Sequence, residues 1–305
     1  MSRMRNSTYR PHIWGLALAV VLGSVAGGCA SAAEAPVVDP GDVAPTGGGG
    51  DVGLENLNAV LWVQTAVEYR ANSLQAFQLA RRLLDDALAD PSWTAALEQV
   101  GNFGALPPAI ILDVDETVLD NSFFEARLTL DNEVYSEPLW DAWVLEEAAI
   151  PIPGALEFIQ YATGRGVTVF YVTNRRAHLE DATRANLEAT GFELPDDLDV
   201  LLMRGERPEW DASDKTPRRR EVASGYRVLL MFGDNMGDFT AASAGTVAER
   251  LEFADSHRDY WGSRWIMLAN PTYGSFIGAV LDNNYGLSWA QQLATKKQAL
   301  DPRRR

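Results

Sequence analysis

The stretch Ala109-Ile110-Ile111-Leu112-Asp113-Val114-Asp115-Glu116-Thr117 decides the fold. Its first four residues are apolar and follow a Pro-Pro pair that stops any helix, so they are predicted to form a short buried parallel strand. Asp113 and Asp115 come where the chain leaves this strand. In an extended segment the two carboxylates would point the same way, whereas a turn would splay them toward different tasks.

Four further short apolar runs have the same character as the first strand. Amphipathic helical patterns, such as those over 154–165 and 178–190, separate most of them. Strands that alternate with helices predict an α/β fold, with a doubly wound parallel sheet whose ligands bind at the carboxyl ends of the strands. The four runs are Val167–Val172, Val200–Met203, Val228–Phe232 and Trp265–Leu268.

The segments around the first strand predict a small, mainly helical cap. Apolar residues recur at helical spacing between Leu54 and Leu97, which indicates two amphipathic helices. The segment 123–150, with Trp140 and Trp143, lies between the first strand and the next helix. We therefore expect a domain over 53–292 with a cap formed by 53–105 and 123–150, followed by a polar tail over 293–305.

Residues 1–28 are predicted to be a lipoprotein signal peptide, since three arginines precede an apolar run and small residues. Cys29 follows and is the expected lipidation site. The alternative is an ordinary cleaved signal in which Cys29 is incidental. Residues 29–52, rich in Ala, Pro and Gly, are predicted to be a flexible tether. The expected location is the cell envelope, with a lipid anchor in the outer membrane that faces the periplasm or the surface.

The composition excludes several classes of protein. The formal net charge is −16, which makes the chain a poor candidate for binding a nucleic acid polymer. A single cysteine excludes an intrachain disulfide, a CxxC redox pair and a cysteine-rich zinc site. The basic runs 218–220 and 303–305 are interpreted as solvated faces. An oligomer remains possible.

Polar residues at the predicted strand ends suggest phosphoryl chemistry. Asp113 can attack phosphorus while Asp115 transfers a proton to and from the leaving group and water. Thr173 and Asn174 end the second strand and can hold phosphate oxygens. Lys215 is a cation that can offset the charge of a phosphoryl group in transfer.

A second pair of acids, Asp234 and Asp238, follows the fourth strand. Carboxylates gathered from two strand ends make an oxygen-only site suited to Mg²⁺, which lets a carboxylate approach a charged phosphate. Each residue alone has a structural alternative, such as a helix cap or a turn for an aspartate. The order of acid pair, hydroxyl, lysine and acid pair favours the functional interpretation.

These motifs resemble those of the haloacid dehalogenase (HAD) superfamily, whose four motifs are similar to Asp113-x-Asp115-x-Thr117, Thr173, Lys215 and Gly233-Asp234-x-x-x-Asp238. The longer match from Ile111 to Ser122 resembles the class C acid phosphatases of subfamily IIIB, the lipoprotein-e group, some of which are 5'-nucleotidases. Three further stretches strengthen the resemblance: 151–155, 171–175 and 270–274. The similarity covers roughly residues 55–290.

The resemblance implies a phosphoaspartyl intermediate on Asp113 and acid–base work by Asp115. It implies phosphate contacts from Thr173, Asn174 and Lys215. It also implies Mg²⁺ bound by Asp113, Asp234 and the main-chain carbonyl of Asp115, with Asp238 in support.

Small phosphomonoesters, namely aryl phosphates and nucleoside 5'-monophosphates, are the implied substrates. By analogy Trp143 and Tyr273 would clasp the leaving group, with Trp140 in reserve, although these aromatics also suit packing within the cap.

Two alternatives remain open. Carbon–halogen hydrolysis, or phosphoryl transfer to a sugar, belongs to the same fold, but dehalogenation needs neither Asp115 nor Asp234. From another class, the chain could be a surface lipoprotein that mainly binds a ligand such as haem.

Overall fold

The computed structural model describes residues 52–303, and its centre is a parallel sheet of five strands in the order β5-β4-β1-β6-β7. Every neighbouring pair is parallel, and β1 pairs with β4 on one side and β6 on the other. All five strands predicted from the sequence are present. They are β1 (Pro108–Leu112), β4 (Thr168–Arg176), β5 (Leu201–Arg204), β6 (Arg227–Gly233) and β7 (Trp265–Met267).

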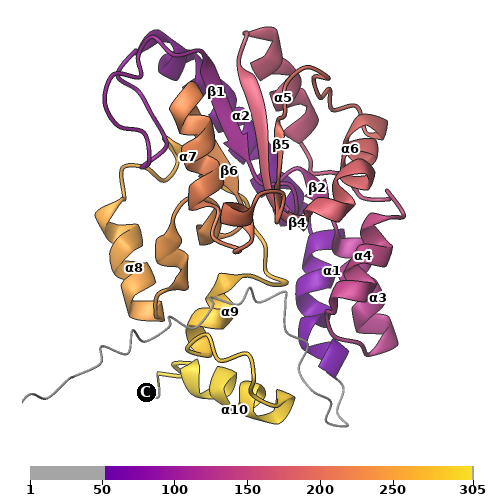
Figure 1. Cartoon of the computed structure of the whole chain (residues 1–305). Coiled ribbons are helices and arrows are strands. Elements are labelled where there is room, and N and C mark those ends of the chain that lie inside the picture. The colour runs from indigo at the N-terminus through magenta and orange to yellow at the C-terminus, as the bar shows by residue number, and fades with distance from the viewer. Residues whose placement is uncertain (1–51, 304–305) are drawn as a thin grey trace, which may run out of the picture. The chain divides into compact units, whose positions relative to one another are not determined.

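Helices cover both faces of this sheet, as the prediction of a doubly wound fold requires. Every residue of β6 is buried, which is typical of a strand in a parallel sheet covered on both sides. Right-handed crossovers put helices that lead toward one edge on one face and helices that lead toward the other edge on the opposite face. Figure 1 shows α5 (Ala155–Gly164) and α6 (Glu180–Ala189) on one side and α7 (Thr216–Gly225) and α8 (Val247–Ser256) on the other.

The long helix α2 (Val67–Ala89) belongs to this layered core and not to the cap. Phe77 of α2 stacks on Phe232 of β6 at 5.8 Å between ring centroids, and it lies at the same distance from Phe158 of α5. Farther along, Ala95 donates its N–H to the carbonyl of Val228 at 2.8 Å. The predicted cap is therefore wrong over 67–105, because periodicity shows that a helix has an apolar face but not which surface covers that face.

The cap consists of the 3₁₀ turn η2 (Val52–Asn56) with α1 (Leu57–Thr65), α3 (Ser122–Asp131) and α4 (Glu137–Val144). Figure 1 shows α1, α3 and α4 together at one end of the sheet. The backbone N–H of Gly53 donates to the side-chain carbonyl of Asn132 at 3.0 Å, which joins η2 to the end of α3. A two-stranded antiparallel ribbon, β2 (Leu119–Asp120) with β3 (Ile150–Pro151), closes the chain loop that carries α3 and α4.

The first part of the expected polar tail is helical. After α9 (Ser275–Val280), α10 spans Trp289–Ala299, so the predicted domain boundary at residue 292 falls inside a helix. Ser288 and Gln291 form a capping box at the start of α10. Lys296 on α10 pairs with Glu55 of η2 at 2.9 Å, which connects the two ends of the described chain. The prediction failed because α10 is mostly polar, so its sequence shows too few apolar residues to reveal a helical periodicity.

The predicted signal peptide, Cys29 and most of the tether lie outside the described residues. Within 52–303, no helix is both long enough and apolar enough to cross a bilayer.

Candidate active site

The sheet order places the predicted motifs side by side. Because β1 lies between β4 and β6, the residues that follow or end these three strands meet at one edge of the sheet. Asp113 follows β1, Thr173 and Asn174 lie near the end of β4, and Asp234 follows β6. Lys215 is the residue directly before α7.

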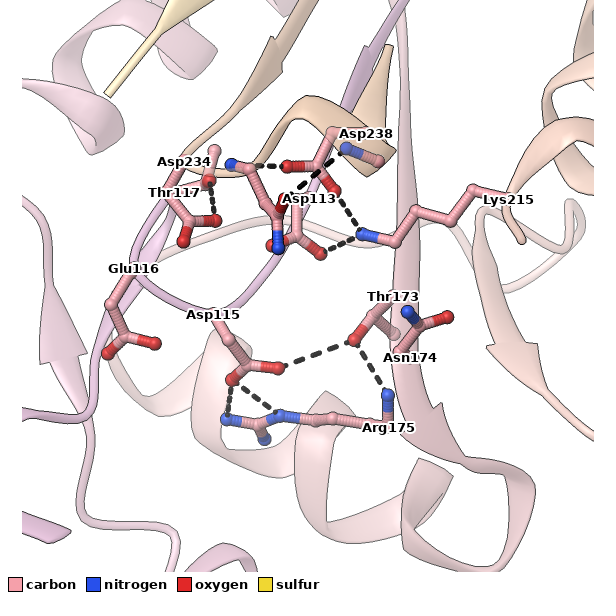
Figure 2. Close-up of polar contacts among 12 residues, drawn as sticks. Asp113, Asp115, Glu116, Thr117, Thr173, Asn174, Arg175, Lys215, Asp234 and Asp238 are labelled. Atoms are coloured by element: carbon pink, nitrogen blue, oxygen red, sulfur yellow. Dashed lines mark hydrogen bonds and ion pairs between the residues drawn. The ribbon is translucent and has the colours of Figure 1, made fainter. Parts of the chain in front are cut away.

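Lys215 lies between two carboxylates in the buried part of the site (Figure 2). Its ammonium donates to Oδ1 of Asp113 at 2.5 Å and to Oδ1 of Asp238 at 2.6 Å. All three side chains are buried, and Lys215 is only 5% exposed. A lysine held this way cannot swing into solvent, so its charge is fixed beside the nucleophile expected at Asp113.

Gly233 lets the loop after β6 close tightly on this ion pair. A Cβ at this position would lie 2.2 Å from Oδ2 of Asp238, so no side chain fits. The same Asp238 oxygen accepts the backbone N–H of Asn235 at 2.9 Å. Both carboxylate oxygens of Asp238 are therefore hydrogen bonded, one to Lys215 and the other to the backbone of the loop.

Three carboxylates gather at this edge of the sheet, and two of them contact the ammonium of Lys215. Oxygen atoms of Asp113, Asp234 and Asp238 all lie within 4.8 Å of one another. Burial raises the pKa of Asp113, its neighbours Asp238 and Asp115 raise it further, and Lys215 offsets only part of the effect. Burial likewise raises the pKa of Asp234 well above its usual range, with Asp238 and Asp113 adding to the rise.

The same excess of carboxylates shifts the pKa of Lys215. Burial works against its charge, but the carboxylates of Asp113 and Asp238 overcome that effect and raise its pKa. The cluster thus has more negative than positive groups in a place with little water. Buried carboxylates need a compensating cation, and an oxygen-only donor set of this kind fits a hard divalent ion. Asp234 is held for such a role by Asn270, whose side chain donates to its Oδ2 at 2.8 Å.

The turn after β1 splays Asp115 away from Asp113, as the sequence suggested it could. Glu116 takes a left-handed conformation with φ of 55°, and its buried carboxylate accepts the N–H of Asn121 at 2.8 Å. Figure 2 shows Lys215 beside Asp113 and Arg175 beside Asp115, with the two groups at separate levels of the site.

Arg175 holds one oxygen of Asp115. Its guanidinium donates twice to Oδ1, from Nε at 3.0 Å and from Nη2 at 2.8 Å. The side-chain amide of Asn121 adds a third donor to the same oxygen at 2.9 Å. Among residues 52–303, the one hydrogen-bond partner of Oδ2 is the hydroxyl of Thr173, at 3.5 Å. Oδ2 is therefore the oxygen available for proton transfer, and Oδ1 is the anchor.

Arg175 was missed as a site residue at the sequence level. It is 2% exposed and also donates to Thr183, although it follows directly on Thr173 and Asn174 in the chain. An arginine two residues after a predicted phosphate-binding threonine was the available signal. It is ambiguous, because alternation along a strand puts both side chains on one face without saying which group they meet.

The run 218–220 is not a solvated face, contrary to the sequence interpretation. Arg218 and Arg219 are 0% and 1% exposed. Arg218 donates to the Thr173 carbonyl and, at 2.7 Å, to Oδ1 of Asn174, while Arg219 pairs with Glu98 at 2.7 Å. The prediction failed because one face of α7 packs on β4 and β6 and buries two of the three arginines.

A cavity of about 690 Å³ opens from the acidic cluster toward the cap and α10. Asp113, Asp115, Asn174, Lys215 and Asp234 line one part of it. Thr173 is fully buried and is not among the residues that line the cavity. In the described part of the chain, its hydroxyl contacts Asp115 and accepts the backbone N–H of Arg175 at 3.0 Å.

The aromatic residues divide differently from the prediction. Tyr273 and Trp140 line the cavity, but Trp143 does not. Trp143 is 2% exposed and donates its indole N–H to Oδ1 of Asn121 at 2.8 Å, so it supports the residue that anchors Asp115. The expectation that Trp143 clasps a leaving group is wrong. Two tryptophans three positions apart on α4 share the apolar side of that helix, and packing alone decides which one reaches the cavity.

The fold and the site define an enzyme of the HAD class, with an aspartate pair after the first strand, a buried lysine and a second acid pair. Comparison with known families agrees. The model of HAD superfamily, subfamily IIIB (acid phosphatase) matches residues 52–276. The chain therefore belongs to this subfamily of phosphomonoester hydrolases, as its motifs predicted.

Individual relatives carry the same description. The solved structure of the class C acid phosphatase from Bacillus anthracis superposes with a TM-score of 0.73 at 32% identity, over 83% of this chain and 99% of that one. Acid phosphatase 1 of Solanum lycopersicum is 29% identical over 44% of this chain and 52% of its own length. The class B acid phosphatase of Salmonella typhimurium is 24% identical over 49% and 65%. The chain thus spans between half and two thirds of these two curated relatives.

Proposed function

We propose that this protein is a magnesium-dependent acid phosphatase that hydrolyses small phosphomonoesters, such as aryl phosphates and nucleoside 5'-monophosphates, through a phosphoaspartyl intermediate on Asp113. The observation that carries the proposal is the buried contact of Lys215 with both Asp113 and Asp238, beside a second carboxylate pocket at Asp234. This arrangement offers a nucleophile, a fixed cation and oxygen ligands in one place.

The proposed reaction divides the work between the two aspartates. A carboxylate oxygen of Asp113 forms a bond to phosphorus while the bond from phosphorus to the leaving oxygen breaks. Asp115 gives a proton from Oδ2 to that leaving oxygen and later takes one from the water that hydrolyses the acyl phosphate. Arg175 and Asn121 hold Oδ1 throughout, which keeps Oδ2 directed at the reacting atoms.

Separate residues of this chain would hold the phosphate and the ion. Lys215 and the side chain of Asn174 are the proposed phosphate contacts, since both line the cavity. Thr173 is now proposed to steady Asp115, and its backbone is held by Arg218. Asp113, Asp234 and the main-chain carbonyl of Asp115 are the proposed Mg²⁺ ligands, with Asp238 in support. The ion would neutralise negative charge between carboxylate and phosphate.

The test is phosphate release from p-nitrophenyl phosphate and from a nucleoside 5'-monophosphate, with Mg²⁺ and with EDTA. We expect activity that EDTA abolishes and added Mg²⁺ restores. Asp113→Asn should lose all but a residual rate, while the control Asp131→Asn, an exposed acid on α3, should keep the wild-type rate. Activity that survives Asp113→Asn would refute the proposed nucleophile. Haem or another ligand bound tightly by a protein that cleaves no phosphomonoester would favour the binding alternative.

The anchoring of the protein is a separate proposal. Lipidation of Cys29 would place the enzyme on a membrane of the cell envelope, with the outer membrane as the proposed location. Radiolabelled palmitate should then enter the wild type but not Cys29→Ala. Equal labelling of the two proteins would refute the lipid anchor.

A further inference from the structure

One face of the cap helix α4 contacts the segment 175–178 at the end of β4. Glu137, Trp140 and Asp141 occupy positions i, i+3 and i+4 of this helix, so their side chains share one face. Each of the three contacts a different residue of the segment. The cap and the core therefore meet along this face of α4.

Two polar contacts hold α4 to this segment, and we refer to them as the α4 latch. Glu137 forms an ion pair with Arg176. One turn farther along the helix, Oδ2 of Asp141 lies 2.8 Å from Nε2 of His178. An ionised carboxylate can only accept a hydrogen bond, so the imidazole donates it. The four side chains are between 31% and 56% exposed, so each contact contributes little to the stability of the fold, and its main effect is to fix the place of α4.

Trp140 lies between the two latch contacts and meets the residue that anchors Asp115. The guanidinium of Arg175 lies over the indole, with 5.5 Å between Cζ and the ring centroid. The same guanidinium donates to Oδ1 of Asp115 at 3.0 and 2.8 Å (Figure 2). The side chain of Arg175 is 1% exposed, and a cation is attracted to an aromatic face most strongly where water is excluded. The indole therefore helps to keep the guanidinium in place against Asp115.

Trp143 of the same helix supports the second anchor of Asp115. Its indole N–H donates to Oδ1 of Asn121 at 2.8 Å, and the side-chain amide of Asn121 donates to Oδ1 of Asp115 at 2.9 Å. One helix of the cap thus contacts both residues that hold this oxygen. A shift of α4 would displace both supports together, and Oδ2 would no longer keep its direction toward the leaving oxygen. Proton transfer depends on that alignment, since donor and acceptor must lie within hydrogen-bond reach.

We propose that the four residues of the α4 latch are positioning residues, which hold the cap helix so that its two tryptophans keep Asp115 aligned for proton transfer. The proposal rests on the proposed phosphatase function and deepens it. None of the four residues is among those that line the cavity, so the latch acts through α4 and not on the substrate. It matters when the leaving oxygen must be protonated and has little effect when that oxygen departs as a stable anion.

The experiment breaks the latch in the full-length protein and measures kcat/KM with Mg²⁺ on two phosphomonoesters. This constant covers the steps up to departure of the leaving group. Ethyl phosphate has an alkoxide leaving group that needs a proton, whereas p-nitrophenolate departs without one. The double variant Glu137→Ala/Asp141→Ala should lower kcat/KM about fivefold on ethyl phosphate, the order of effect expected from two exposed contacts of this kind. On p-nitrophenyl phosphate the loss should stay below about twofold.

Two further variants serve as controls. Glu137→Gln/Asp141→Asn keeps the shape and an oxygen acceptor at both positions, so it should retain most of the rate on ethyl phosphate. Asp85→Ala/Glu221→Ala breaks two ion pairs outside the cap whose side chains are between 40% and 51% exposed, and it should leave the ratio of the two constants unchanged. Circular dichroism and the melting temperature of each variant establish that it is folded.

The outcomes separate the two proposals. A wild type that cleaves neither phosphomonoester refutes the proposed function and the role of the latch with it. Cleavage by the wild type together with unchanged constants in Glu137→Ala/Asp141→Ala overturns the latch alone. An equal or larger loss on p-nitrophenyl phosphate would assign these contacts a purely structural role in the cap and would also overturn the latch.

Discussion

Glu125 gives a sharp test of the structure that does not depend on any substrate. The pKa of its carboxyl rises from 4.5 to about 7 in the fold, mainly because the group is buried. The folded protein therefore binds this proton more tightly than the unfolded chain does. Between pH 4.5 and about 7 the folded state holds more protons, so the free energy of unfolding must fall as the pH rises.

The size of the effect follows from the two pKa values. Each pH unit between them is worth about 1.4 kcal/mol, so burying the ionised carboxyl costs about 3 kcal/mol above pH 7. Below pH 4.5 the cost is absent, because the group is protonated in both states. Glu125→Gln has no proton to lose, and its amide oxygen can still accept from Asn56. The free energy of unfolding of the variant, relative to that of the wild type, should therefore increase by about 3 kcal/mol when the pH is raised from 4 to 8.

The assay is urea unfolding of both proteins at several pH values, followed by circular dichroism, with Mg²⁺ omitted so that metal binding does not change with pH. Other groups titrate equally in the two proteins, so the difference between the curves isolates Glu125. The exposed acid Asp131 provides the control, since Asp131→Asn should give a curve parallel to the wild type. A pH-independent difference between Glu125→Gln and the wild type would show that this carboxyl is solvated. That result would contradict the burial of Glu125 in the cavity wall.

Other predictions follow from contacts around the two aspartates. Arg175→Gln removes two of the three donors to Asp115 and should lower kcat about 100-fold on an alkyl phosphate. The loss on p-nitrophenyl phosphate should be smaller, because its leaving group departs without protonation, and equal losses in steady-state assays would contradict a positioning role. Gly233→Ala puts a Cβ 2.2 Å from the carboxylate of Asp238 and should cost about 1–3 kcal/mol in unfolding experiments along with most of the activity. An unaffected variant would show that the loop can move aside. Trp143→Phe should lower kcat and leave substrate selectivity unchanged, since Trp143 is buried outside the cavity. A changed preference among leaving groups would show that Trp143 contacts the leaving group in the cavity.

The parallel sheet and the order of the chemical groups could be predicted from the amino-acid sequence alone. Each strand is a short apolar run with a polar break after it, and both features are local in the chain. Parallel strands share one carboxyl edge, so Asp113, Thr173 and Asp234 had to come near one another once the strands paired in a doubly wound sheet. The motif left two arrangements of the aspartates open, parallel or splayed, and the turn that the chain takes within the motif decided for the splayed one.

The contacts between individual side chains depend on the folded structure and could not be predicted from the sequence. Helical periodicity predicted α2 but not that Phe77 packs on the sheet, and composition hid α10 because few apolar residues mark it. Trp140 and Trp143 look equivalent in sequence, yet only Trp140 lines the cavity. Glu125 pairs with Asn56 across 69 residues of chain. Such contacts depend on the packing of separate helices, whose geometry arises from the sum of many weak interactions that no local pattern contains.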